Sequence, residues 1–475
     1  MYCKRSNPDG GRSASSPGRI LSLRVVLYHA PMTGQVLAFG LLVAPLAYSA
    51  TFTKDVAPIF FARCAGCHRP NDVAPMSLLD YKSARPWAKA IREAVMARKM
   101  PPWFADPRWG SFANDARLSE TEIETIKAWV DAGAPEGDSR DLPAPPAFIE
   151  GWRLGKPDII IDIGEDFSVK PGRDSYEHFV VPANFSEGKW IRAAEIRPGN
   201  RKVVHHVHVS VIADTSQAGP TSIESMTALN QFLVRDGTLT RVRMDAPVVD
   251  DACAADAPDL PYLRGFQEGA LASFLPGRAP DVFPDGSAKW IPPRSKFEFV
   301  IHYARTSGPP QTDRTSVGLY LAPAQPERTL RRMDLRNFFF RIPSGAARHE
   351  VKRCYTFERD KLLLSVTPHM HYRAHDVTYE LIHFGGKRET LLVVPHYDFN
   401  WQLVYRLKEP LYVEKGSRLI VTAHYDNSPN NPANPDPAQT VRWGDRSEEE
   451  MMTSWIEYFD APAESRIGAK PLAAE

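Results

Sequence analysis

One short motif, CAGCH at residues 64–68, determines both a cofactor and the kind of domain that must surround it. Two cysteines separated by two residues and followed by a histidine form the attachment motif of c-type haem. The thiols of Cys64 and Cys67 would form thioethers with the haem, and the imidazole of His68 would ligate the iron. A thioredoxin-like pair or half of a zinc site is the alternative, but the chain has no second CxxC and no strand-helix-strand pattern around the motif. The motif predicts one covalent haem near the N-terminus.

Residues 51–137 have the pattern of a small all-α domain around this motif. A segment that starts at Pro86 contains good helix formers and must stop before Pro101. Ser119 and Glu122 have the spacing of a capping box at the start of a later amphipathic helix. The sequence therefore predicts a cytochrome c domain over residues 51–137.

The second axial ligand of the haem iron is expected to be a methionine. We predict Met100, because Pro101 and Pro102 place it at a rigid helix exit. Met76 is the alternative, and an open or different sixth position is the third option. Methionine is also a common core residue, so the type of side chain alone does not decide among them.

Residues 1–50 resemble a leader. Residues 32–50 form an apolar run that is short for a membrane span and ends in small side chains, as signal peptides do. Cleavage near Ser49 or Ala50 would send the chain to the periplasm or the exterior and leave no stable membrane span. An uncleaved anchor is the alternative, and Met32 is a second candidate for the start of translation.

The cysteines fit an exported chain. Cleavage of the leader removes Cys3 and leaves Cys64 and Cys67 in the haem motif, with Cys253 and Cys354 elsewhere. An oxidising compartment permits a disulfide between the last two. The sequence alone leaves that pairing open.

The composition excludes some classes of partner. The 475 residues carry 58 basic and 57 acidic side chains, a net charge of +1, so no global field attracts nucleic acid or anionic lipid. The chain has no glycine-rich phosphate loop, which argues against nucleotide chemistry. Its length is that of about three domains, and the 42 prolines fit loops and strand edges better than a helical bundle.

The pattern changes after a proline-rich linker at residues 138–155. Short β-branched and aromatic runs then alternate with Gly, Pro and Asn, as in Ile159–Ile161. This pattern predicts two all-β sandwich domains, at residues 156–325 and 326–462, and a tail at 463–475.

Histidines cluster on two predicted strands of the first sandwich. Residues 203–209 read VVHHVHV, and a period of two places His206 and His208 on one face and His205 on the other. A second strand carries His302. A lone strand histidine usually has a structural role, but grouped histidines favour a metal site.

A second cluster lies near the C-terminus of the chain. His369 and His371 flank a methionine and share a face, while Met451 and Met452 follow three glutamates. Imidazole sets with one thioether suit copper, since sulfur favours Cu(I) and nitrogen accepts both oxidation states. The alternative is that these are ordinary strand histidines satisfied by the backbone.

Four segments together resemble the ligand motifs of the copper type II, ascorbate-dependent monooxygenases. They are Lys202–Val209, Val300–Ala304, His369-Met370-His371 and Glu450-Met451. This family includes the peptidylglycine- and dopamine-hydroxylating enzymes. The resemblance covers roughly residues 156–462 and implies two jelly-roll sandwich domains that each hold one copper.

The resemblance also implies a role for each ligand. An electron-transfer copper would be bound by His205, His206 and His302. A second copper, which binds oxygen and hydroxylates the substrate, would be bound by His369, His371 and Met451, with Met452 as the alternative to Met451.

Some positions depart from the family pattern. Thr367 stands where the peptide-amidating branch has an arginine for the substrate carboxylate, which argues against a glycine-extended peptide. Thr453 and Trp455 replace polar substrate contacts and indicate a more apolar pocket. His208 is either an alternative ligand or, as we expect, a solvated strand residue. The substrate, a small molecule or a peptide, stays open.

The function expected from the sequence is an exported haem- and copper-dependent monooxygenase. Hydroxylation of a C–H bond with O2 consumes two electrons, and each copper supplies one. The haem would pass electrons to the coppers from an exported donor, either an ascorbate-like reductant or a redox protein. A non-catalytic electron-transfer or copper-binding protein with a cytochrome head is the alternative.

Overall fold

A computed structural model describes residues 50–461 with short gaps at 71, 73, 150, 173, 213–231, 237–238, 255–265, 268, 276–277 and 305–306. The predicted leader, apart from Ala50, and the predicted tail lie outside the described residues. Within the described ranges, no helix has both the length and the hydropathy needed to cross a membrane.

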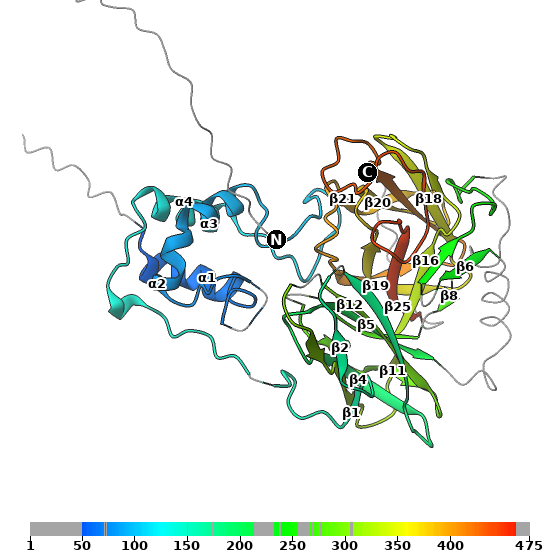
Figure 1. Ribbon diagram of the computed structural model, residues 1–475, viewed down its shortest axis with the longest axis horizontal. Coiled ribbons are helices and arrows are strands. Elements are labelled where there is room, and N and C mark those ends of the chain that lie inside the picture. Colours follow the sequence, from blue (N-terminus) through cyan, green and yellow to red (C-terminus); the bar gives the residue numbers. More distant parts are fainter. Residues whose placement is uncertain are drawn as a thin grey trace, which may run out of the picture. The chain divides into compact units, whose positions relative to one another are not determined.

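The N-terminal part of the described chain is a small helical region (Figure 1). Its elements are η1 (Phe52–Val56), α1 (Ala57–Arg63), α2 (Tyr81–Ala84), η2 (Arg85–Trp87), α3 (Ala88–Met96), α4 (Glu120–Asp131) and η3 (Ser139–Asp141). Phe52, Phe60 and Trp129 form the centre of its core, with ring centroids 6.1–6.2 Å apart. A helical region followed by β structure confirms the predicted order of fold classes.

The capping box predicted for α4 is confirmed. The Ser119 side chain accepts a hydrogen bond from the Glu122 backbone at 3.2 Å, and the Glu122 carboxylate accepts from the Ser119 backbone at 2.7 Å. The predicted helix start at Pro86 is wrong. Asp80 caps an earlier turn by accepting from the Ser83 backbone at 2.8 Å, so the helical segment begins at Tyr81.

The first sandwich consists of two main sheets around one core. One sheet has the order β1 (Ile159–Asp162), β14 (Ser316–Leu321), β4 (Lys189–Arg197), β11 (Ser287–Ile291), β15 (Arg328–Thr329), and β10 (Asp281–Val282) also pairs with β4. The other has the order β3 (Ser175–Pro182), β12 (Lys296–Tyr303), β5 (Val204–Ile212), β9 (Ala270–Phe274). A short pair joins β2 (Phe167–Val169) to β13 (Gln311–Asp313).

The second sandwich has the same layered plan. One sheet has the order β22 (Tyr405–Val413), β19 (Lys361–His369), β25 (Thr453–Asp460), β16 (Arg331–Arg336), β8 (Phe266–Gln267). The other has the order β18 (His349–Thr356), β23 (Arg418–Tyr425), β20 (Ala374–Ile382), β21 (Arg388–Val394). Short pairs join β17 (Arg341–Ile342) to β24 (Val441–Arg442) and β6 (Leu233–Asp236) to β7 (Leu239–Val242).

Alternation along the strands determines which side chains leave each core. In β12, Phe297, Phe299 and Ile301 are fully buried in the first core, so His302 projects from the opposite face of its sheet. In β25, Ile456 packs in the second core and Trp455 projects the other way.

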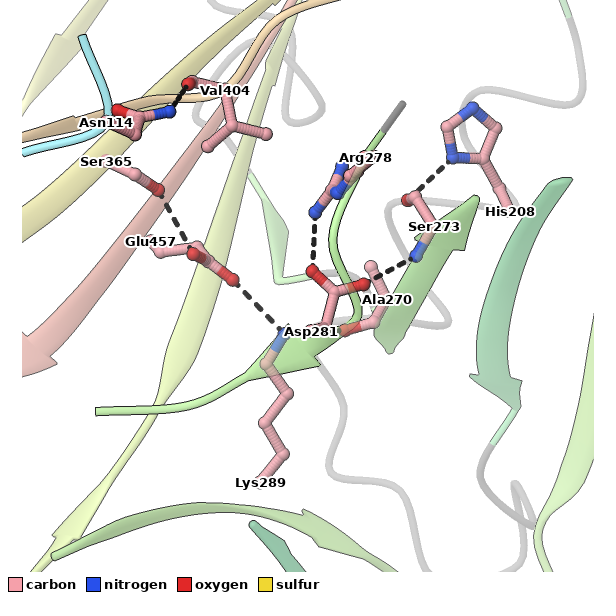
Figure 2. Close-up of polar contacts among 10 residues, drawn as sticks. All are labelled: Asn114, His208, Ala270, Ser273, Arg278, Asp281, Lys289, Ser365, Val404 and Glu457. Carbon is pink, nitrogen blue, oxygen red and sulfur yellow. Dashed lines mark hydrogen bonds and ion pairs between the residues drawn. The ribbon is translucent and has the colours of Figure 1, made fainter. Parts of the chain in front are cut away.

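These two outward faces meet between the sandwiches, where the ring centroid of His208 on β5 lies 5.5 Å from that of Trp455 on β25. Phe459 of β25 belongs to the hydrophobic core of the first sandwich. The ammonium group of Lys289, from β11, lies 3.3 Å from a carboxylate oxygen of Glu457 on β25 (Figure 2). The predicted metal ligands of both sandwiches lie on or beside these faces, which explains why such polar side chains are buried.

Two further segments pack against the second sandwich. Residues 103–116, which leave the helical region, place Trp103 against Tyr405 with ring centroids 5.0 Å apart. In the same segment, the Asn114 side chain donates to the Val404 carbonyl at 2.7 Å (Figure 2).

The second of these segments precedes Cys253 in the chain. Val242, Ala246 and Val249 are buried in the core of the second sandwich, although they lie between β5 and β9 of the first in sequence. Cys253 forms a disulfide with Cys354 of β18, which realises the pairing that the sequence left open.

Candidate metal centres

Three imidazoles converge at the outward face of the first sandwich. The Nδ1 atoms of His205 and His206 are 3.2 Å apart, those of His205 and His302 3.2 Å, and those of His302 and His206 3.3 Å. Nitrogens with these separations can all lie about 2.0 Å from one ion, the usual metal–imidazole distance. The three residues form a group that could hold a metal ion.

A β-bulge brings His205 into this group. His302 of β12 pairs with His206 of β5, but the next residue, Tyr303, pairs with Val204, so His205 is an extra residue in its strand. A bulge lets neighbouring side chains point to the same side, which strict alternation forbids. The predicted placement of His205 on the opposite face is therefore wrong, whereas its predicted grouping with His206 and His302 agrees with the geometry.

Two imidazoles of the first site, those of His205 and His206, have lowered pKa values. Burial lowers the pKa of His205 to about 4, and the neighbouring His302 adds to this effect. Burial also lowers the pKa of His206 well below its ordinary value. Nearby imidazoles, which include His369 of the other sandwich, lower it further by a smaller amount. Neutral imidazole is the form that binds metals, so these two rings need not lose a proton to bind an ion near neutral pH.

Two side chains hold the His302 ring in place. Tyr176 stacks on it with parallel planes and ring centroids 4.4 Å apart. The Nε2 atom of His302 lies 3.2 Å from a carboxylate oxygen of Asp174. A carboxylate behind a ligating histidine fixes its tautomer and strengthens it as a ligand, which leaves Nδ1 for the ion.

The second site lies where β19 ends. His369 and His371 are buried with ring centroids 5.5 Å apart. The Nδ1 atom of His369 lies 2.8 Å from the side-chain oxygen of Gln402, and that of His371 lies 3.3 Å from the backbone carbonyl of Glu449. Both Nδ1 atoms are therefore donors, and the lone pairs lie on Nε2. Burial lowers the pKa of His371 to about 3, so this ring is neutral.

The two adjacent methionines occupy different environments. Met452 is 1% exposed and belongs to the core of the second sandwich. Met451 is half-buried at the edge of that core. Met451 is therefore the more accessible of the two, and its assignment as the thioether ligand stays a prediction.

Glu450 connects the histidine segment to Met451. Its buried carboxylate accepts hydrogen bonds from the backbone N–H groups of Met451 at 2.9 Å, Arg373 at 2.9 Å and His371. Burial raises the pKa of Glu450 to about 7. One carboxylate thus positions the backbone of two predicted ligands that are far apart in sequence.

The haem motif forms a hydrogen-bonded turn directly after α1. The backbone N–H groups of Cys67 and His68 both donate to the Cys64 carbonyl, at 3.1 and 2.9 Å. Both thiols are free, and burial raises the pKa of Cys64 to about 12. Burial lowers the pKa of His68, an effect that the nearby backbone of Met76 partly offsets. Among the described residues, the Nδ1 atom of His68 is buried without a hydrogen-bond partner.

The two candidate haem methionines lie in different places. Met76 packs against the core of the helical region. Met100 follows α3 and is half-buried, with its backbone N–H directed to the Ala94 carbonyl at 3.4 Å. The choice between them stays a prediction.

Several residues that orient the predicted metal ligands through hydrogen bonds or stacking are not predicted from the sequence. Gln402, Asp174 and the Glu449 carbonyl lie in segments without periodicity, and no local pattern identifies them. Tyr176 lies opposite His302 in the strand register, so it could have been found only after β3 and β12 were paired.

Comparison with solved structures gives only weak similarity. The major capsid protein P2 of bacteriophage PM2 is 9% identical, with a TM-score of 0.23, and the match covers 64% of this chain and 97% of that one. PNGase F, a glycosylasparaginase from Flavobacterium meningosepticum, is 9% identical, with a TM-score of 0.24, and covers 64% of this chain and 96% of its own. At these scores neither match carries an argument.

Comparison at the level of sequence is more informative for one part of the chain. No curated protein matches significantly. The family model described as copper type II ascorbate-dependent monooxygenase, C-terminal domain, matches residues 341–468. This range contains His369, His371 and Met451. The second sandwich is therefore similar to the C-terminal domain of the copper type II ascorbate-dependent monooxygenases.

Proposed function

We propose that the protein is an exported monooxygenase that hydroxylates a C–H bond with O2, using two mononuclear coppers and a c-type haem. The observation that carries this proposal is the convergence of His205, His206 and His302 on one point beside a domain of the copper monooxygenase type. The reaction takes one oxygen atom into the C–OH product and releases the other as water, with the input of two electrons and two protons.

The donor sets fit copper. The first site offers three imidazole nitrogens. The second offers two imidazole nitrogens, and family similarity suggests the Met451 thioether as the third ligand. Bound copper supplies one electron per ion and, at a three-ligand site, an open coordination position for O2.

The residues around the sites prepare the ligands and limit access of water. Gln402 and the Glu449 carbonyl hold the second pair of imidazoles with Nε2 outward. His206, His302 and His371 are at most 3% exposed, so a bound ion would be largely shielded from bulk solvent. Shielding strengthens electrostatic interactions at the site and restricts side reactions.

The helical region fits a haem attached at Cys64 and Cys67. Both thiols are free, and the neutral imidazole of His68 directly follows them. Met100 would be the second ligand of the haem iron, with Met76 as the alternative. The haem would accept single electrons from an exported donor, either an ascorbate-like reductant or a redox protein.

The Cys253–Cys354 disulfide supports a periplasmic or secreted location, because such bonds persist in oxidising compartments. The substrate is proposed to be a small molecule or a peptide without a requirement for a terminal carboxylate. Thr367 offers no cation where the peptide-amidating branch has an arginine, and Thr453 and Trp455 replace polar substrate contacts of that branch.

Metal analysis of the full chain, expressed with haem maturation and loaded with copper, tests the proposal. We expect one iron and two coppers per chain, with two distinct Cu(II) signals in electron paramagnetic resonance (EPR). Met451→Ala should weaken binding of one copper and leave haem reduction by ascorbate unchanged.

Met452→Leu is the matched control. It replaces a core methionine with a side chain of similar volume, so both coppers should stay bound. Iron without copper in the wild-type chain would contradict the proposal.

A further inference from the structure

A continuous row of aromatic rings joins the two metal centres. The His206 ring centroid lies 5.4 Å from that of His208, which lies 5.5 Å from that of Trp455. Trp455 in turn stacks on His369, with centroids 5.0 Å apart and planes inclined by 26°. His206 and His369 are predicted ligands of different sites, so two intervening side chains connect one site to the other.

Trp455 is held firmly in this row. Its indole N–H donates to a carboxylate oxygen of Asp334 at 3.0 Å, and Asp334 is fully buried. The guanidinium group of Arg332 lies over the indole ring, 4.7 Å from its centroid. Asp334 lies opposite Trp455 in the register of β16 and β25, so the sheet itself determines this contact.

His208 is held from the other sandwich. Its Nδ1 atom lies 2.9 Å from the Ser273 hydroxyl, and the Ser273 backbone N–H donates to Asp281 at 2.9 Å (Figure 2). Arg278 donates to the same carboxylate at 2.5 Å. The expectation that His208 is a solvated strand residue is therefore wrong, because its ring is anchored and directed between the sandwiches.

A role as metal ligand does not explain why His208 and Trp455 lie between the two sites. His208 is not part of the convergent group formed by His205, His206 and His302. Trp455 has no atom suited to bind a metal, because its only heteroatom is a donor. Both rings nevertheless lie in van der Waals packing between two predicted ligands, and electron tunnelling is faster through packed atoms than across solvent.

We propose that His208 and Trp455 form the electron bridge between the two copper sites. This inference rests on the proposed function, since it requires copper at both sites. One electron leaves Cu(I) at the first site, which becomes Cu(II), and reduces Cu(II) at the second site to Cu(I). The rings stay closed-shell and serve only as the medium. Trp455 also positions His369 through the stacking contact.

Freeze-quench EPR of the copper-loaded full chain tests this bridge without any substrate. The fully reduced protein is mixed with O2, to which the two coppers together give two electrons, and with two protons this yields hydrogen peroxide. The reduced haem holds a third electron, and its oxidation is followed by absorbance in the same samples. We expect the Cu(II) signal of the first site to appear roughly tenfold more slowly in Trp455→Leu and His208→Leu, about 1.4 kcal/mol in activation free energy. Trp455→Phe should restore part of the rate, because it keeps a ring against His369.

Tyr458→Leu is the matched control. Tyr458 is a buried aromatic residue of the same strand that packs in the second core, three positions from Trp455 and on the other face. Its loss should leave the transfer rate unchanged. Copper content and equilibrium EPR spectra are measured for every variant.

Two results would overturn the bridge. One is a wild-type transfer rate in Trp455→Leu and His208→Leu chains that hold two coppers. The other is loss of copper from either site in these variants, which would make the rings supports for the ligands. Fewer than two coppers in the wild-type chain would instead refute the proposed function.

Discussion

At the scale of single residues, the ring nitrogens distinguish the two centres. Nδ1 atoms converge at the first site, whereas at the second Gln402 and the Glu449 carbonyl hold Nδ1 of the histidines and leave Nε2 for the ion. The orientation of the two histidines at the second site thus depends on one side chain and one backbone carbonyl that are not predicted ligands. Loss of such a partner typically weakens metal binding by about 10- to 100-fold.

Gln402→Leu should weaken copper binding at the second site by roughly 10- to 100-fold, because His369 loses the acceptor that fixes its tautomer. Competitive copper titration with EPR assignment of each site measures the change. Gln402→Glu keeps an acceptor and should retain most of the affinity. Asn400→Ala, an exposed change in the same loop, is the control, and equal affinities in all variants would contradict the argument.

At the scale of elements, the sequence predicts where strands lie but does not predict the β-bulge in β5. A β-branched run correctly predicted a strand at Ile159–Ile161, a strand was also correctly predicted around His302, and the capping box identified the start of α4. Alternation misplaced His205, because a bulge arises from pairing with a distant strand and leaves no simple local signal. The role of Gln402 could not be predicted for a related reason, since only tertiary contact brings its loop to His369.

Strands β3 and β12 also share a pH-sensitive pair. His178 lies 3.1 Å from Glu298, and this hydrogen bond raises the pKa of His178 above its ordinary value of 6.5. The stabilisation is therefore complete below that value and is lost as the pH rises through the higher pKa of the folded state. Its size is below about 1 kcal/mol, since both side chains are partly exposed.

We expect His178→Gln to flatten the dependence of the melting temperature on pH between about pH 6 and about pH 8. Thermal unfolding followed by circular dichroism measures this slope. Glu298→Gln should flatten it similarly, because it removes the other partner. An unchanged slope in both variants would show that the pair makes no contribution.

At the scale of the whole molecule, contacts between distant segments tie the sandwiches and the helical region together. Residues 103–116 and the segment around Val242 pack against the second core, although both lie outside residues 326–462. The sequence indicated helical and sandwich parts from changes in local pattern. It could not indicate these contacts, nor the meeting of the two outward faces, because each depends on surfaces formed only after folding.

The Cys253–Cys354 disulfide is expected to stabilise this arrangement. It closes a loop with a sequence separation of 101, and removal of such a bond costs roughly 2–5 kcal/mol. The double variant Cys253→Ser/Cys354→Ser should therefore melt at a lower temperature in differential scanning calorimetry. The wild-type chain treated with a reductant should have the same melting temperature as the variant. A variant with the melting temperature of the untreated wild type would refute the expectation.

The bulge in β5 makes the first site sensitive to insertions and deletions in this strand. His205 and His206 point toward the same predicted metal position only because the strand contains one residue more than its partner. Deletion of Val204 would keep every ligand in the sequence and still turn one imidazole away. Length variation within this strand is therefore as damaging to metal binding as substitution of a histidine, and related chains can be sorted by gaps in an alignment as well as by residue identity.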